Sequence, residues 1–340
     1  MNTNLRHISY CLIASLLFAA CRKESHPLTP EEPEEQYAIS MNAASVTDMT
    51  TSRALVTNDA DLQKPNTNLG VFAYKQLADD TKVSVFENER IYYTNTDGWK
   101  YDNTKYWDKA ATKYCFVAYY PYLTDNIRYN NQNLTISKIP CWQTIDGSET
   151  DYLVANSHGT AEEYLATTSK SVGLNFRHIL SQLEVRVAKN DFLQSTYTLT
   201  KVEYVNVPEN VNSTYTYNGT NGTDNMTTTM ASSITIDDAT RVVGKEGDLD
   251  KEGDYPRVIF KHLVVPFDLT DQNQIEVKLS YKVGQSTDTK TPQVATGVSK
   301  LEAGKRYVLT LIFNSGAVID TSLEILDWVN EDVYEDKYNW

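Results

Sequence analysis

Alternation of apolar and polar side chains is the feature that most constrains how this chain of 340 residues can fold. In its clearest instance, Ile275, Val277, Leu279, Tyr281 and Val283 take every second position and the residues between them are polar. A period of two buries one face of a β-strand and exposes the other. Similar patterns predict strands at 70–74, 82–87, 113–120, 133–139, 151–155, 171–176, 183–187, 198–207, 232–236, 258–264, 307–313 and 323–328.

Turn residues separate these runs, and their spacing indicates the fold class. Gly, Asn, Asp and Pro interrupt the chain between short strands, a pattern typical of antiparallel β-sandwiches. The segment 113–120 is apolar on both faces, which predicts a strand buried on both sides. Only residues 161–165 predict a helical turn, and the polar segments 208–232 and 244–254 predict exposed loops. We therefore expect an all-β protein.

The length of the chain predicts two domains, because some 300 residues exceed one ordinary core. We expect domains at residues 37–179 and 180–340, divided between two predicted strands. Residues 22–36 contain three Pro and five Glu and almost nothing apolar. Such a segment cannot bury enough surface to offset its chain entropy, so residues 21–36 predict a flexible acidic tether.

The N-terminus has the layout of a bacterial lipoprotein signal. A basic n-region is followed by an apolar run at residues 8–20, which ends in small residues directly before Cys21. Thirteen residues at about 1.5 Å each cannot cross a hydrocarbon core of about 30 Å. We therefore expect residues 1–20 to be a cleaved signal peptide and Cys21 to carry lipid. This predicts attachment to the outer membrane, facing the cell surface.

The net charge argues against two classes of partner. It is −14 for the whole chain and becomes −15 when residues 1–20, with their single Arg6, are removed. A strongly acidic chain repels phosphate backbones and anionic lipid surfaces. We expect no nucleic-acid partner, and membrane attachment only through the lipid on Cys21.

Two cysteines remain beyond the lipidation site. Cys115 and Cys141 could form a disulfide in an oxidising envelope, or they could be two separate buried thiols. Sequence spacing leaves both alternatives open.

The residues with catalytic or metal-binding chemistry form no pattern. His158, His178 and His262 lack zinc-ligand spacing, and an acidic loop beginning at Asp248 has Ile259 where a calcium loop needs Glu. No nucleophile elbow or phosphate loop occurs. We predict no catalytic residues, no metal and no cofactor, and the chain is not expected to be an enzyme.

Three tryptophans are candidates for stacking on sugar rings. For Trp99, Trp107 and Trp142, packing in the core or in a hairpin is the favoured interpretation.

Short motifs spread along the chain resemble those of the fimbrillin family of Bacteroidales-type pili. They follow the same order over most of the sequence, beginning with the lipoprotein signal and Cys21. The matching segments are 51–54 (TSRA), 69–74 (LGVFAY), 106–107 (YW), 116–122 (FVAYYPY), 151–155 (DYLVA), 172–178 (VGLNFRH), 180–185 (LSQLEV), 265–266 (VP), 301–307 (LEAGKRY) and 325–328 (ILDW).

The resemblance implies two tandem transthyretin-like antiparallel β-sandwich domains and a maturation route. A precursor is exported as a lipoprotein and cleaved after an arginine, which corresponds here to the bond between Arg53 and Ala54. Cleavage removes an N-terminal strand, and another subunit's strand fills the groove, which is β-augmentation. The segment 37–41 is strand-like and lies upstream of Arg53, as this route requires.

The donor strand comes from the C-terminal end in the family. Here residues 321–340 carry Leu323, Ile325, Trp328, Val333 and Tyr334 as candidate groove-filling side chains. The alternative is that 323–328 is the last strand of the second sandwich and that the rest is a frayed end.

The predicted function is that of a structural pilus subunit that supports adhesion and polymerises with other pilin subunits in a fimbrium. The alternative is a permanently lipidated surface protein that binds a glycan or a host ligand.

Overall fold

Strands dominate the computed structural model, which describes residues 37–42, 59–219, 221–248, 258–269, 273–315 and 319–328. Among the described strand pairs, all are antiparallel except two, so the predicted all-β class is confirmed. The helical segments are α1 (Asp59–Leu62), α2 (Ala161–Ala166) and a 3-10 turn at Glu246–Asp248. No helix in the described ranges has the length and apolar character needed to cross a bilayer.

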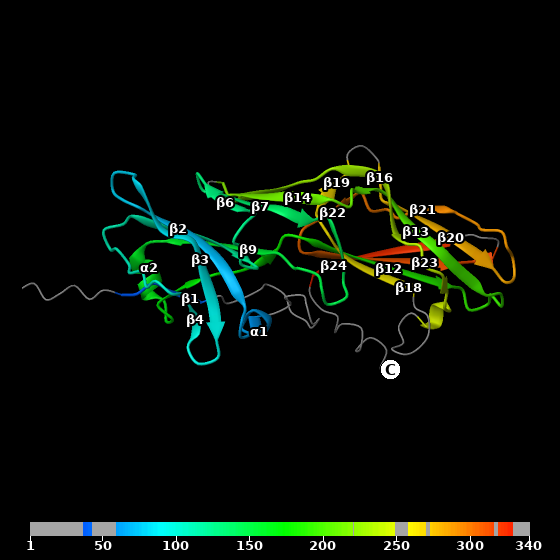
Figure 1. Cartoon of the computed structure of the whole chain (residues 1–340), viewed down its shortest axis with the longest axis horizontal. Helices are drawn as coiled ribbons and strands as arrows, with labels where there is room; N and C mark the ends of the chain where they lie inside the picture. The colour runs from blue at the N-terminus through cyan, green and yellow to red at the C-terminus, as the bar shows by residue number, and fades with distance from the viewer. Residues whose placement is uncertain are drawn as a thin grey trace, which may run out of the picture. The chain divides into compact units, whose positions relative to one another are not determined.

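Residues 68–178 contribute the strands of a six-stranded antiparallel sheet (Figure 1). Its order is β11 (Arg177–His178), β9 (Leu153–Gly159), β5 (Lys113–Tyr120), β2 (Asn68–Gln76), β3 (Lys82–Thr94) and β4 (Gly98–Lys100). A separate pair joins β1 (Ser40–Asn42) in parallel to β10 (Ser171–Gly173).

The central strand β5 is buried on both faces, as its sequence predicts. Tyr114, Phe116 and Ala118 point to one face and are fully buried. Val117 and Tyr119 point to the other face and are also buried.

A four-stranded sheet corrects the predicted loop at 208–232. Its order is β15 (Thr223–Thr227), β14 (Asn212–Asn218), β7 (Asn133–Pro140) and β6 (Ile127–Asn130). Ser213, Tyr215 and Tyr217 are buried on alternate positions of β14. The prediction of a loop was wrong because the apolar face of this strand is made of tyrosine rings between polar residues. The other predicted loop, 244–254, lies partly outside the described residues.

Two more sheets are formed mainly by the later part of the chain, with β8 added from the earlier part. The first has the order β24 (Ile319–Asp327), β23 (Lys305–Phe313), β12 (Ser181–Lys189), β18 (Val258–Val264) and β8 (Trp142–Thr144). The second has the order β16 (Met230–Asp237), β13 (Tyr197–Pro208), β20 (Glu276–Val283) and β21 (Gln293–Ala295), with β17 (Arg241–Val242) also paired to β13. A short pair joins β19 (Phe267–Asp268) to β22 (Lys300–Leu301).

A large apolar cluster draws on both of these sheets. It includes Val185 and Leu309 from one and Tyr204 and Leu279 from the other, each no more than 1% exposed. Burial of each such side chain contributes about 1.5–3 kcal/mol. This is the core of a sheet-on-sheet packing.

A second cluster combines residues from both sides of the predicted domain boundary. Tyr119 and Leu134 precede residue 180, while Tyr215, Leu263 and Trp328 follow it. Strands also pair across it, β7 with β14 and β8 with β18. The predicted domain boundary between residues 179 and 180 stays a prediction. Residues before and after it share sheets and a core cluster.

Cys115 and Cys141 are not bonded to each other. Cys115 is half-buried, and Cys141 is buried with its Sγ 3.1 Å from the hydroxyl of Thr228. Of the two alternatives left by the sequence, the structure has two separate thiols.

Candidate functional site

The short strand β1 is paired along one edge, and the residue before it, Ile39, is bonded on the opposite side. On one edge it pairs with β10, and the amide of Leu174 donates to the carbonyl of Asn42 at 3.1 Å. On the other edge the amide of Ile39 donates to the carbonyl of Lys105 at 2.8 Å, and the hydroxyl of Tyr101 donates to the carbonyl of Ile39 at 2.5 Å. Edge groups that would otherwise be unpaired are satisfied from both sides.

Side chains alternate between the interior and the solvent over residues 38–41, which include the start of β1. Ile39 is 1% exposed and Met41 is 6% exposed, while Ala38 and Ser40 face outward. The hydroxyl of Ser40 donates to the carbonyl of Lys170 at 3.0 Å. The two buried side chains, the pairing with β10 and the bonds at Ile39 make the segment 38–42 an integral part of the fold.

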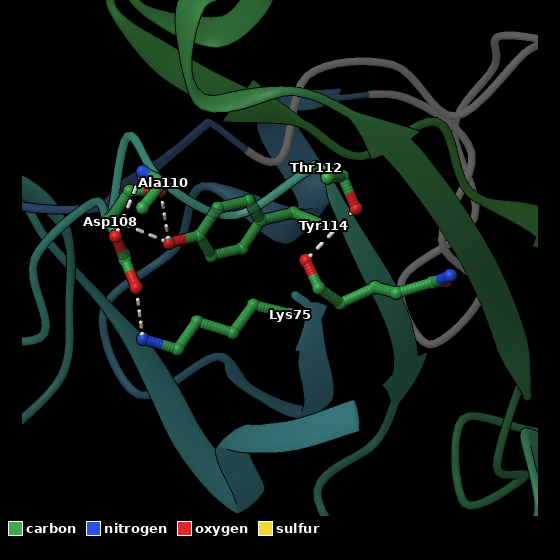
Figure 2. A network of polar contacts seen from close by, with 6 residues as sticks. Lys75, Asp108, Ala110, Thr112 and Tyr114 are labelled. Atoms are coloured by element: carbon green, nitrogen blue, oxygen red, sulfur yellow. Dashed lines mark hydrogen bonds and ion pairs between the residues drawn. The ribbon is translucent and has the colours of Figure 1, made fainter. Parts of the chain in front are cut away.

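Residues 101–112, which connect β4 to β5, lie next to the segment 38–42 and form the wall of its site. Its anchor is Asp108, shown in Figure 2 between Lys75 and Tyr114. The ammonium of Lys75 lies 2.7 Å from the Asp108 carboxylate, and the Asp108 amide donates to the Tyr114 hydroxyl at 2.6 Å. The hydrogen bond from Lys75 lowers the pKa of the Asp108 carboxyl below its usual value.

Two further hydrogen bonds fix residues 108–112 of the same connection. The amide of Ala110 donates to the Asp108 carboxylate at 2.9 Å (Figure 2). The hydroxyl of Thr112 donates to the carbonyl of Gln76 at 3.1 Å. These contacts tie the connection to β2 and β5. Lys105 itself is held by its amide, which donates to the hydroxyl of Tyr101 at 3.2 Å.

An aromatic cluster supports the connection from inside. Trp107 is buried, stacks on Tyr164 at 4.9 Å between ring centroids and meets Tyr114 edge-on at 4.7 Å. Phe86 meets Tyr101 edge-on at 5.1 Å. Aromatic pairs in these geometries add about 0.5–1.5 kcal/mol beyond their burial, so they stiffen the wall.

The residues predicted for lipidation and cleavage, Cys21, Arg53 and Ala54, lie outside the described residues. So do Val333 and Tyr334 of the candidate donor segment. Their roles stay predictions.

The rest of the candidate donor segment pairs with its own chain. Leu323 and Ile325 lie in β24, which is antiparallel to β23 at the edge of its sheet. Ile325 is 56% exposed, whereas Trp328 is buried and stacks on His178 at 4.2 Å between ring centroids. Residues 319–327 therefore form a strand in a sheet of the same chain. Their role as a donor to another subunit stays a prediction.

The tryptophans considered for sugar stacking pack against other side chains in the core or in a hairpin, as the favoured interpretation expects. Trp107 belongs to the aromatic cluster described above. Trp142 stacks on Tyr204 at 5.1 Å and donates from its indole to the carbonyl of Pro208 at 2.9 Å. Trp99 meets Tyr93 edge-on at 5.4 Å across the β3–β4 hairpin.

The histidines occupy separate environments. His178 lies 3.0 Å from the carboxylate of Asp151, with both side chains buried. His262 is buried against Trp142, and burial lowers the pKa of its imidazole to about 4. Among the residues that the structure describes, no three His, Cys, Asp or Glu side chains gather as metal ligands would.

Sequence reasoning identified the β1 segment but missed its partners. Lys105 acts through its backbone carbonyl, which leaves no trace in residue type. The only available signal was the aromatic pair at 106–107, part of the family motif.

Comparison with known proteins gives the family. The family model for fimbrillin-like proteins matches residues 52–328. Among solved structures, a fimbrial protein from Bacteroides vulgatus has a TM-score of 0.55 at 15% identity, over 87% of this chain and 100% of that one. A candidate cell adhesion protein from Bacteroides uniformis has a TM-score of 0.50 at 16% identity, over 88% of this chain and 100% of that one. A search of curated proteins found no sequence match.

At these identities the two solved structures share the fold, while the family model carries the assignment. Proteins of this family are structural components of fimbriae, which are cell-surface appendages, and not enzymes. Because the matched region covers most of the sequence, the chain belongs to the fimbrillin-like family.

Proposed function

We propose that this protein is a pilus subunit that polymerises by strand exchange. In this scheme the precursor is exported with lipid on Cys21, a protease cleaves between Arg53 and Ala54, and a strand from another subunit replaces β1. The observation that carries the proposal is the position of β1 and the residue before it, which lie upstream of Arg53 and contribute the buried side chains of Ile39 and Met41 to the fold.

Removal of β1 would leave a groove with a defined chemistry. The carbonyl of Lys105, the amide of Leu174 and one edge of β10 would lose their partners, at a cost of about 1–3 kcal/mol for each buried group. The spaces of Ile39 and Met41 would also open. An incoming strand with apolar side chains two positions apart restores both sets of contacts.

The supported wall explains why the groove would persist after cleavage. The Lys75–Asp108 ion pair and the stacking of Trp107 on Tyr164 are made by residues outside β1, so they would help to keep the connection that carries the Lys105 carbonyl in place. A preorganised groove lowers the ordering cost of binding a strand.

The donor in this proposal is the C-terminal segment 321–340 of a neighbouring subunit. Within the described residues, β24 is an edge strand with one free side and mostly exposed side chains. An edge strand of this kind can be released at a smaller cost than a central one.

Mass spectrometry of the termini of protein recovered from cell-surface fibres tests the proposal. We expect assembled subunits to begin at Ala54 and precursors to carry lipid on Cys21. The variant Arg53→Gln should accumulate as uncleaved precursor outside fibres, while Arg90→Gln, at an exposed arginine, should assemble normally. Assembled subunits that all retain residues 22–53 would contradict the proposal.

A further inference from the structure

A hollow of about 290 Å³ lies on the face of the β2–β5–β9 sheet that carries Cys115. This is the face opposite the Phe116 side chain, because successive residues of a strand point to opposite sides. Two turns form its rim, and the amide of Gly219 in one donates to the carbonyl of Gln132 in the other at 2.8 Å. The volume is near the lower end of the roughly 300–1,000 Å³ typical of small-molecule sites.

Tyrosine rings form much of the lining, and neighbouring side chains fix them. Tyr129 stacks on Phe72 at 5.0 Å between centroids, and the guanidinium of Arg177 lies 5.5 Å from the centroid of Tyr217. Tyr74 donates from its hydroxyl to the side-chain oxygen of Gln132 at 2.6 Å. Rings held in this way offer a preorganised apolar surface with polar tips.

Several polar groups open onto the hollow without protein partners. Within the described part of the chain, the hydroxyls of Tyr129 and Tyr217 and the side chains of Asn156 and His158 make no hydrogen bond. Burial raises the pKa of Tyr129 to about 12, so its hydroxyl stays a donor at neutral pH. The side-chain amide of Gln132 keeps its NH₂ group for a ligand, since its oxygen accepts from Tyr74.

The charge of the lining is the reverse of that of the whole protein. The chain carries a net charge of −14, yet no Asp or Glu lines this hollow. Lys113 lines it and has no ion pair among the described residues. An unpaired ammonium beside neutral amides and hydroxyls favours a ligand with one negative group.

We propose that this hollow binds a saccharide ring that carries a carboxylate. The C–H face of the ring would lie on the tyrosines, its hydroxyls would bond to Asn156, His158 and Gln132, and its carboxylate would face Lys113. The site is independent of the β1 groove, so subunits in a fibre would present it repeatedly, whether or not the strand-exchange proposal holds.

Cys115 provides a built-in reporter, because it lines the hollow and is half-buried, whereas Cys141 is fully buried. The experiment measures iodoacetamide alkylation of Cys115 by peptide mass spectrometry on the full chain, with Cys115→Ser verifying the assignment. We expect saturating N-acetylneuraminic or glucuronic acid to slow alkylation about fivefold or more, and glucose or galactose to protect less.

Variants at exposed positions separate binding from folding. Asn156→Ala should raise the concentration for half-protection about tenfold, as expected for one lost hydrogen bond of about 1.4 kcal/mol. Lys113→Gln should remove the preference for acidic over neutral sugars. Asn225→Ala, an exposed asparagine at a different hollow, is the matched control and should change nothing.

Two outcomes overturn the inference. If no sugar protects Cys115, the hollow is not a saccharide site. If acidic and neutral sugars protect equally, the site does not recognise a carboxylate. Neither outcome bears on fibre assembly, which the termini of assembled subunits test separately.

Discussion

Gly70 in β2 shows how a single residue can be required by close packing. A Cβ at this position would lie 2.1 Å from the ring of Tyr119 on the neighbouring strand β5. Tyr119 is fully buried and donates from its hydroxyl to Asn88 at 2.5 Å, so the ring has little freedom to move. We expect Gly70→Ala to lower the free energy of unfolding by about 1–3 kcal/mol, measured by urea denaturation.

Gly173 provides the control for this prediction. A Cβ added there meets no heavy atom within 4 Å, and its backbone φ is not positive. Gly173→Ala should change stability by less than about 1 kcal/mol. Equal losses in the two variants would show that the Tyr119 contact is not the cause.

His262 makes stability depend on pH in a defined window. Burial lowers the pKa of its imidazole to about 4 in the folded protein, against about 6.5 when unfolded. Between these values the unfolded chain binds more protons, so stability falls as the pH drops from 6.5 toward 4. From pH 7 to pH 4.5 this contribution is about 2–3 kcal/mol.

The variant His262→Phe should remove that part of the pH dependence, because phenylalanine cannot bind a proton. Urea denaturation at pH 7 and at pH 4.5 measures the difference between the two proteins. His158→Phe, at an exposed histidine, is the control. If His262→Phe loses as much stability between pH 7 and pH 4.5 as the wild type does, groups other than His262 cause the pH dependence.

At the scale of the element, the connection between β4 and β5 depends on its anchor. Asp108→Asn removes the charge that pairs with Lys75 at 2.7 Å, and because the pair is partly exposed we expect a loss of about 1 kcal/mol at pH 7. The pKa of Asp108 is lowered in the folded state, so its contribution exists above the unfolded pKa and disappears as the pH falls through the folded one. The difference between wild type and variant should therefore shrink below about pH 4.

Asp97→Asn, which breaks the exposed pair with Lys100, is the matched control and should cost less than about 0.5 kcal/mol. If the two variants lose the same amount, the Asp108 network does not anchor the connection.

The strand β1 should behave as a separable part of the fold. A chain of residues 54–340 lacks Ile39 and Met41, so we expect it to unfold at a lower temperature than the chain of residues 22–340. A synthetic peptide of residues 36–43 should restore the difference by filling the groove. Differential scanning calorimetry measures both effects.

Peptide variants define the cause of the rescue. Met41→Asp in the peptide should abolish it, because the carboxylate would be buried without a partner. Ala38→Ser, at an outward-facing position, should preserve it. Rescue by the Met41→Asp peptide would exclude a groove filled by apolar anchors.

At the scale of the whole molecule, strand pairing couples the two predicted domains. β7 pairs with β14, and β8 pairs with β18, across the predicted boundary between residues 179 and 180. We expect residues 37–179 expressed alone to lack cooperative unfolding, because the partner strands of β7 and β8 are missing. Far-UV circular dichroism during thermal unfolding tests this, with the chain of residues 22–340 as reference. Cooperative unfolding of the fragment would show that the halves are independent.

Many elements were predictable because their patterns are local. Alternation predicted β2, β7, β13, β20 and β23 close to their observed bounds, and the turn at 161–165 corresponds to α2. The helix begins where the Thr160 hydroxyl accepts from the amide of Glu163. This capping motif is formed by residues only three apart in the sequence. β14 was missed because tyrosine rings between Thr, Ser and Asn do not resemble an apolar face. β15 was missed because its only apolar residue is Met226 and its other side chains are exposed and polar.

The sequence by itself determined that this protein is built of strands, and it predicted a strand at 37–41, where the structure has β1 at Ser40–Asn42. Only the tertiary structure decided which segments pair with β1, which rings line the hollow beside Cys115, and how the two predicted domains share a core. Alternation reflects the burial of one face and is readable within a few residues. Pairing depends on backbone groups that every residue shares, from segments as far apart as Ile39 and Lys105, and residue type does not encode it.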